Sequence, residues 1–125
     1  MATSSRITSM PEADTAYQAA LAALHKAHSA LDVVINSSPV NWTAYKQGLA
    51  TCTSCQNAAQ AAEDVFGTAI LDTPAVETLI HALTSNTQEM TQSAAELDKT
   101  AEEFKKLAKA ADTLSSVLGN ILKFI

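Results

Sequence analysis

Apolar residues recur every three or four positions along most of the chain, which is the pattern of helices that bury one face. The repeat forms one stripe before residue 36 and a second stripe between residues 41 and 66. The first consists of Tyr17, Ala20, Leu21, Leu24, Ala27, His28, Leu31, Val34 and Ile35, and the second of Trp42, Tyr45, Leu49, Cys52, Ala59, Ala62 and Phe66. Strand-type alternation is nearly absent, so the pattern predicts an all-α protein.

Short polar segments separate the predicted helices. Ser9 and Glu12 have the spacing of a capping box at the first helix start. Either Ser38 followed by Pro39, or Asn41, can open the second helix. Gly67 can close the second helix in a left-handed conformation, and Thr73 followed by proline can open the next one. The predicted helices therefore cover about residues 11–36, 39–66 and 74–123.

One heptad frame continues without a shift from residue 76 to residue 125. One seam position holds Val76, Leu83, Met90, Leu97, Phe104, Ala111, Leu118 and Ile125. Its companion position holds Leu79, Leu107, Leu114 and Ile121, interrupted by the polar residues Asn86, Ser93 and Thr100. Because no glycine or proline lies between Pro74 and Gly119, we predict one long final helix. Two alternative breaks would give four helices instead: the polar segment 84–88, and the segment 97–103, where Thr100 and Glu103 have capping-box spacing.

The predicted architecture is an up-and-down helical bundle in which a helical hairpin packs on a long C-terminal helix. With 125 residues, the chain fits a single domain over residues 11–125, preceded by a disordered N-terminal arm over residues 1–10. The composition agrees with long helices, because 24 residues are alanine and only three each are glycine and proline.

The net charge of −5 is unevenly distributed. Residues 1–98 carry ten acidic and three basic side chains, whereas residues 99–125 carry five lysines and three acidic side chains. A basic stripe for phosphate contacts is lacking, so we expect no nucleic-acid partner. Neither a cleaved signal peptide nor a run of roughly 20 apolar residues occurs, which gives a cytoplasmic location by default. Export without a cleaved signal remains open.

Two histidines and two cysteines have spacings that metal sites also use. His25 and His28 would lie at about the level of Cys52 and Cys55 if the first two helices form an antiparallel hairpin, and these four are ligand types of structural zinc. The stripes, however, place His25 towards solvent, Cys52 in the core and Cys55 on the flank. We therefore expect no bound zinc or other cofactor, and a larger destabilisation from replacing Cys52 by serine than from replacing Cys55.

Catalytic constellations are sparse in the sequence. The Cys-Thr-Ser-Cys segment is expected in the middle of a helix, without the strand–helix setting in which such dithiols become reactive. No Glu-x-x-His of a di-iron bundle occurs, and the three glycines are isolated. These features predict that the protein is not an enzyme.

The segment "NTQEMTQSAAELDKTAEEFKKLA" (86–108) is similar in composition to the signalling helices of bacterial chemoreceptors, and also to helical secretion substrates and helical pore-forming toxins. This is a resemblance of composition without a shared motif. The primary hypothesis is a non-catalytic interaction protein that self-associates or binds a protein partner through its heptad seams. The expected contact residues are Leu118, Ile121, Leu122, Phe124 and Ile125.

Two alternative functions remain open. The first is a membrane-active, toxin-like or interfacial protein that uses its basic amphipathic segment 104–125, in which lysines accompany an apolar stripe. The second, minor alternative is a metal-binding helical bundle that uses the histidine and cysteine pairs.

Overall fold

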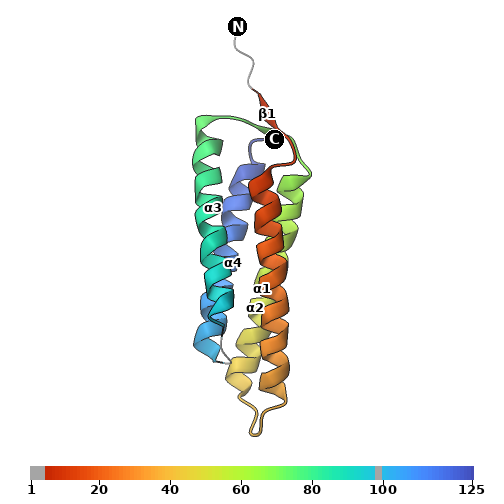
Figure 1. The fold of residues 1–125 in the computed structure, drawn as a ribbon, viewed down its shortest axis with the longest axis vertical. Coiled ribbons are helices and arrows are strands. Elements are labelled where there is room, and N and C mark those ends of the chain that lie inside the picture. Colours follow the sequence, from red (N-terminus) through yellow and green to blue (C-terminus); the bar gives the residue numbers. More distant parts are fainter. Residues whose placement is uncertain (1–4, 98–99) are drawn as a thin grey trace.

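Four helices pack as an up-and-down bundle in the computed structural model, which describes residues 5–97 and 100–125 (Figure 1). The elements are β1 (Arg6–Ile7), α1 (Pro11–Ile35), α2 (Trp42–Phe66), β2 (Ile70–Leu71), α3 (Pro74–Ala95) and α4 (Ala101–Leu122). α1 packs against α2 and α3, and α4 packs against the same two helices. The predicted all-α fold class is thereby confirmed.

The connection from α2 to α3 crosses one end of the bundle, because these two helices are diagonal neighbours (Figure 1). Within this connection, β2 pairs antiparallel with β1, with Arg6 opposite Leu71 and Ile7 opposite Ile70. The backbone N–H of Leu71 also donates to the carbonyl oxygen of Phe124 at 2.7 Å. Residues 5–7, the α2–α3 connection and the segment after α4 therefore meet over the same end of the bundle.

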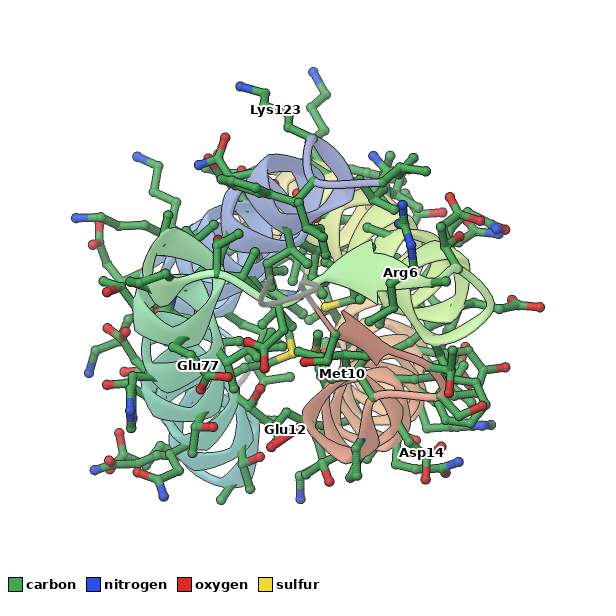
Figure 2. The ribbon with its side chains drawn as sticks, turned by 90° about the horizontal axis from the view of Figure 1, so that it is seen from above. Arg6, Met10, Glu12, Asp14, Glu77 and Lys123 are labelled. Atoms are coloured by element: carbon green, nitrogen blue, oxygen red, sulfur yellow. The ribbon has the colours of Figure 1, made fainter. Side chains whose placement is uncertain are left out.

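The segment before α1 differs from the disordered arm that we predicted for residues 1–10. β1 is paired, and Met10 is buried over the interior of the bundle, whereas Asp14 and Lys123 point outward (Figure 2). Met10 is also the N-cap of α1, and it makes no side-chain capping bond, so the predicted cap by Ser9 is wrong. Burial of the Met10 side chain against the apolar end of the bundle accounts for the order of this segment. Residues 1–4 lie outside the described residues.

The other three helices begin at capping residues that the sequence offered, and α2 starts after Asn41 and not at Pro39. Asn41, Thr73 and Thr100 each accept a hydrogen bond from the backbone N–H three residues later, at 3.1, 3.2 and 3.3 Å. Gly67 follows α2 as its C-cap, but with a φ of −84° it does not adopt the predicted left-handed conformation.

The single long final helix is a wrong prediction, and the chain forms α3 and α4 instead. The break falls at the Thr100 cap, whereas the polar segment 84–88 lies inside α3. Asp98 and Lys99 lie outside the described residues. A straight helix of about 50 residues would span roughly 75 Å, about twice the length of α1 or α2, and would leave half of its seam uncovered. Folding back buries both halves, as the fully buried Met90 and Phe104 show.

The core joins small side chains on α1 and α2 to large side chains on α3 and α4. The buried residues of α1 are mostly alanines, whereas α4 contributes Phe104 and several leucines. Gly48 of α2 lies directly beside Leu31 and Phe104. The buried hydroxyl of Thr51 lies 2.7 Å from the carbonyl oxygen of Phe104, to which it donates, and this bond links α2 to α4.

Candidate interaction surface

Large apolar side chains of α2 point to solvent, in contrast to the stripe that we predicted for the core. Trp42 is 58% exposed, Leu49 46% and Phe66 39%. The buried face of α2 is formed instead by Ala44, Gly48, Thr51, Cys52, Cys55, Ala58, Ala59, Ala62 and Val65. This face of mostly small residues lets α2 approach its neighbours closely, and it leaves Trp42 and Leu49 on the outer side of the helix.

An apolar surface, which we call the hairpin patch, consists of Ile35, Trp42, Tyr45 and Leu49. Trp42, Tyr45 and Leu49 are spaced by three and four residues, so they lie on one side of α2. Ile35 ends α1 and Trp42 begins α2, at the two ends of the same loop. The rings of Trp42 and Tyr45 meet edge to face with centroids 5.8 Å apart. Because Tyr45 is itself packed against the core, it supports the exposed indole.

The position of the patch distinguishes it from a scattered exposed leucine or valine. The α1–α2 hairpin projects beyond the C-terminal end of α3 and the N-terminal end of α4, so no other helix of residues 5–97 and 100–125 covers this end of the bundle (Figure 1). Residues 33–45, which form the projecting end, contain no charged side chain. Val33 is also exposed, but two residues from Ile35 it lies on a different side of α1, and Phe66 lies at the opposite end of α2.

The five predicted contact residues near the C-terminal end of α4 are mostly occupied within the bundle. Leu118 and Ile121 are fully buried, and Leu122 and Phe124 are partly buried against the core. Only Ile125 is widely exposed, at 71%. These residues therefore do not form the broad exposed surface that we expected, because the segment after α4 docks on the α2–α3 connection.

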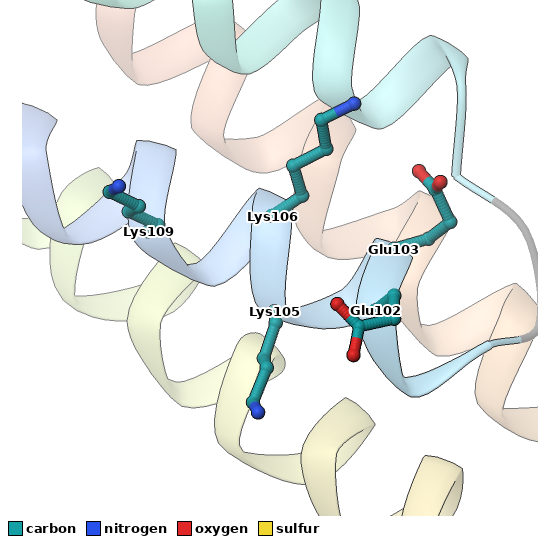
Figure 3. A pocket seen from close by; sticks show the side chains of 5 residues that line it. All are labelled: Glu102, Glu103, Lys105, Lys106 and Lys109. Atoms are coloured by element: carbon teal, nitrogen blue, oxygen red, sulfur yellow. The ribbon is translucent and has the colours of Figure 1, made fainter.

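The basic side chains of α4 do not converge on one site. Lys106 points towards α3 and Lys105 towards α2, on opposite sides of the helix (Figure 3). Lys106 pairs with Glu96 at 3.8 Å, and Glu102 and Glu103 line the same open groove as the lysines. The apolar stripe of α4 faces the core. In the folded bundle, the exposed side of α4 thus carries charges of both signs, and its apolar side is not exposed.

The histidine and cysteine pairs lie on different helices and in different environments. His25 and His28 are exposed on α1, so the predicted inward position of His28 is wrong, whereas Cys52 and Cys55 are buried thiols on α2. Among the described residues, no group of three or more potential ligands lies close enough together to hold a metal ion. Burial raises the pKa of both thiols, that of Cys55 to about 12, with a smaller contribution from Cys52 beside it.

Cys55, rather than Cys52, lies deeper in the core. Cys55 is fully buried and Cys52 is 8% exposed, which reverses the order that we predicted from the stripe. We therefore expect Cys55→Ser to destabilise the protein by about 1–3 kcal/mol, because its hydroxyl would be buried among apolar side chains, and Cys52→Ser to cost less. Urea unfolding of the two variants checks this order. Equal losses, or a larger loss for Cys52→Ser, would show that the depth of burial is not decisive here.

Carboxylates gather at the end of the bundle opposite the hairpin patch. Hydrogen bonding to Asp72 raises the pKa of Glu77, and the negative charges of Asp72 and Glu12 add to this shift. Glu77 is exposed and Glu12 is half-buried, and Figure 2 shows both on the side of the bundle where α1 and α3 lie next to each other. Because Glu77 is exposed, its raised pKa follows chiefly from the hydrogen bond to Asp72 and from the neighbouring negative charges, and not from deep burial.

In comparisons with known proteins, no family model matches the chain, and no curated protein and no solved structure shows significant similarity to it. Within residues 5–97 and 100–125, no helix combines the length and the hydropathy that a membrane span requires.

The hairpin patch was missed in the sequence because periodicity assigned its largest residues to the core. Two signals in the sequence point to it. One is the second stripe of α2, where Ala44, Gly48, Thr51, Cys55 and Ala58 repeat at helical spacing. The other is the absence of charge over residues 33–45, around the single tryptophan of the chain.

Proposed function

We propose that the protein is a non-catalytic helical interaction module that binds a protein surface, either of a second copy or of another protein, through the hairpin patch. The observation that carries this proposal is the exposed Trp42, held edge to face by Tyr45 on the projecting, uncharged end of the hairpin. The heptad seams, which we first expected to make the contact, are occupied by the bundle's own helices.

The composition of the patch supports protein binding. Tryptophan and tyrosine are enriched at protein interfaces and among the residues that dominate binding energy, whereas charged residues are depleted at interface centres. An exposed indole offers a large apolar area at a low entropic cost, and its contact with Tyr45 restricts it further. Isolated exposed apolar residues are common, but a tryptophan grouped with leucine, isoleucine and tyrosine at a projecting end is less so.

Photocrosslinking in the cells that make the protein tests the proposal. A benzophenone amino acid at position 49 should form protein crosslinks, because this position lies in the patch, and Trp42→Ala should reduce their yield about tenfold, as expected for a central contact residue. The matched control places the same group at position 60. Gln60 is exposed on the same side of α2, five helical turns from Trp42 and outside the patch.

Two results would overturn the proposal. One is a crosslink yield at position 49 that does not exceed the yield at position 60. The other is binding of the purified protein to phosphatidylcholine and phosphatidylglycerol vesicles that is lost in Trp42→Ala, since the patch would then be a membrane contact.

A further inference from the structure

We infer that the occupant of the hairpin patch is a second copy of this chain, in a two-fold arrangement that places Asp32 of each copy opposite Lys46 of the other. This inference rests on the proposed function and names the partner. It is carried by the arrangement of charge around the patch.

The patch is flanked by one charge of each sign. Asp32 and Lys46 are the only charged residues between positions 32 and 49, and both are exposed. Neither forms an ion pair within the part of the chain that the structure describes, where the one salt bridge joins Lys106 to Glu96. Both charges are therefore available to a partner.

Helical spacing places these charges on the same sides as the apolar residues. Asp32 precedes Ile35 by three residues on α1, and Lys46 follows Trp42 by four and precedes Leu49 by three on α2. In a two-fold contact, any pair of residues that meets does so twice, with the roles of the copies exchanged. An Asp32–Lys46 contact thus forms two opposite-charge pairs around an apolar centre.

A second copy suits this surface because of the charge on the remainder of the chain. With a net charge of −5, two copies repel each other across most relative orientations. The segment 32–49 has a net charge of zero, so contact through it brings two copies together with little repulsion. Stable complexes typically use roughly 20–30 residues a side, whereas the hairpin patch has four apolar residues, and we therefore expect a weak, concentration-dependent dimer.

Charge exchange tests the arrangement in purified full-length protein. Sedimentation velocity over a range of concentrations should show dimerisation of the unmodified protein. Asp32→Lys and Lys46→Asp should each weaken it about tenfold, because each creates two like-charge contacts, and the double exchange should restore it. Thermal unfolding should be nearly unchanged in all three variants, since both positions are exposed.

Net charge alone predicts a different result. Asp32→Lys changes the net charge from −5 to −3, so a general repulsion effect would strengthen dimerisation in this variant. Asp14→Lys makes the same change at the opposite end of α1, at an exposed position outside the patch, and serves as the matched control. We expect Asp14→Lys to leave dimerisation intact or to strengthen it slightly.

Three results would overturn the inference, and the crosslinking experiment distinguishes them from a failure of the proposed function. If the protein is a monomer at all concentrations, a second copy is excluded as the occupant of the patch. Crosslinks from position 49 to another protein would then show that the proposed function still holds. A dimer insensitive to both charge exchanges excludes the arrangement. A dimer insensitive to Trp42→Ala places self-association on another surface.

Discussion

Replacing Gly48 by alanine is expected to destabilise the protein by about 1–3 kcal/mol, although alanine is the better helix former by about 1 kcal/mol. A Cβ atom at this position would lie 2.5 Å from Leu31 Cδ2 and 3.0 Å from Phe104 Cζ. Both neighbours are buried, so relief of the clash requires a shift of core side chains or of α2 itself. Urea unfolding followed by circular dichroism should show a lower midpoint with an unchanged slope.

Gly119→Ala is the matched control, because the same change occurs in a helix without the clash. Gly119 is exposed on α4, and a Cβ atom there would meet nothing within 4 Å. We expect this variant to gain about 0.5–1 kcal/mol from helix propensity alone. If Gly48→Ala were stabilised to the same extent, the contact of α2 with Leu31 and Phe104 would be looser than the structure shows.

Helix boundaries were largely predictable because they depend on local chemistry. Asn41 and Thr73 cap their helices at the positions that the sequence indicated, since a side-chain acceptor before the first turn satisfies a backbone N–H in almost any fold. The same chemistry exists at Thr100, but no glycine or proline forces a turn there. The choice between one helix and two depends on burial against distant segments, which a local pattern does not contain.

The rotation of α2 could not be read from hydrophobic periodicity. Two stripes coexist on this helix, one with large residues such as Trp42 and Leu49, and one with small residues around Gly48. A pattern based on hydrophobicity assigns the large residues to the core. The bundle buries the small ones, because Gly48 allows the close approach of Leu31 and Phe104. The predicted order of the two cysteines failed for the same reason.

The segment after α4 shows the opposite error, since apolar residues that we expected on the surface are buried. Their environment depends on β2, which lies about 50 residues earlier in the chain and crosses the same end of the bundle. A contact between segments so far apart in the sequence is determined by the tertiary fold, and a local pattern does not predict it. The sequence therefore showed that Ile121 and Phe124 are apolar, but it did not show whether their side chains are buried or exposed.

Deleting residues 120–125 is expected to lower the free energy of unfolding by more than about 3 kcal/mol. The deletion removes the fully buried Ile121, the partly buried Leu122 and Phe124, and the carbonyl oxygen that accepts the hydrogen bond from Leu71. Loss of one buried isoleucine alone costs about 2–5 kcal/mol in other cores. Thermal unfolding should show the midpoint falling by many degrees, since about 1 kcal/mol corresponds to several degrees in a domain of this size.

Two single substitutions separate core packing from a surface role of this segment. Ile121→Ala should account for most of the loss, whereas Ile125→Ala should stay within about 0.5 kcal/mol of the unmodified protein, because the Ile125 side chain is mostly exposed. Ile125→Ala should also leave dimerisation unchanged, because the C-terminus lies at the end of the bundle opposite the α1–α2 loop, after which Trp42 begins α2 (Figure 1). A deletion variant that unfolds at the original temperature but no longer dimerises would contradict this assignment, because the segment would then act as a contact surface and the hairpin patch would not explain self-association.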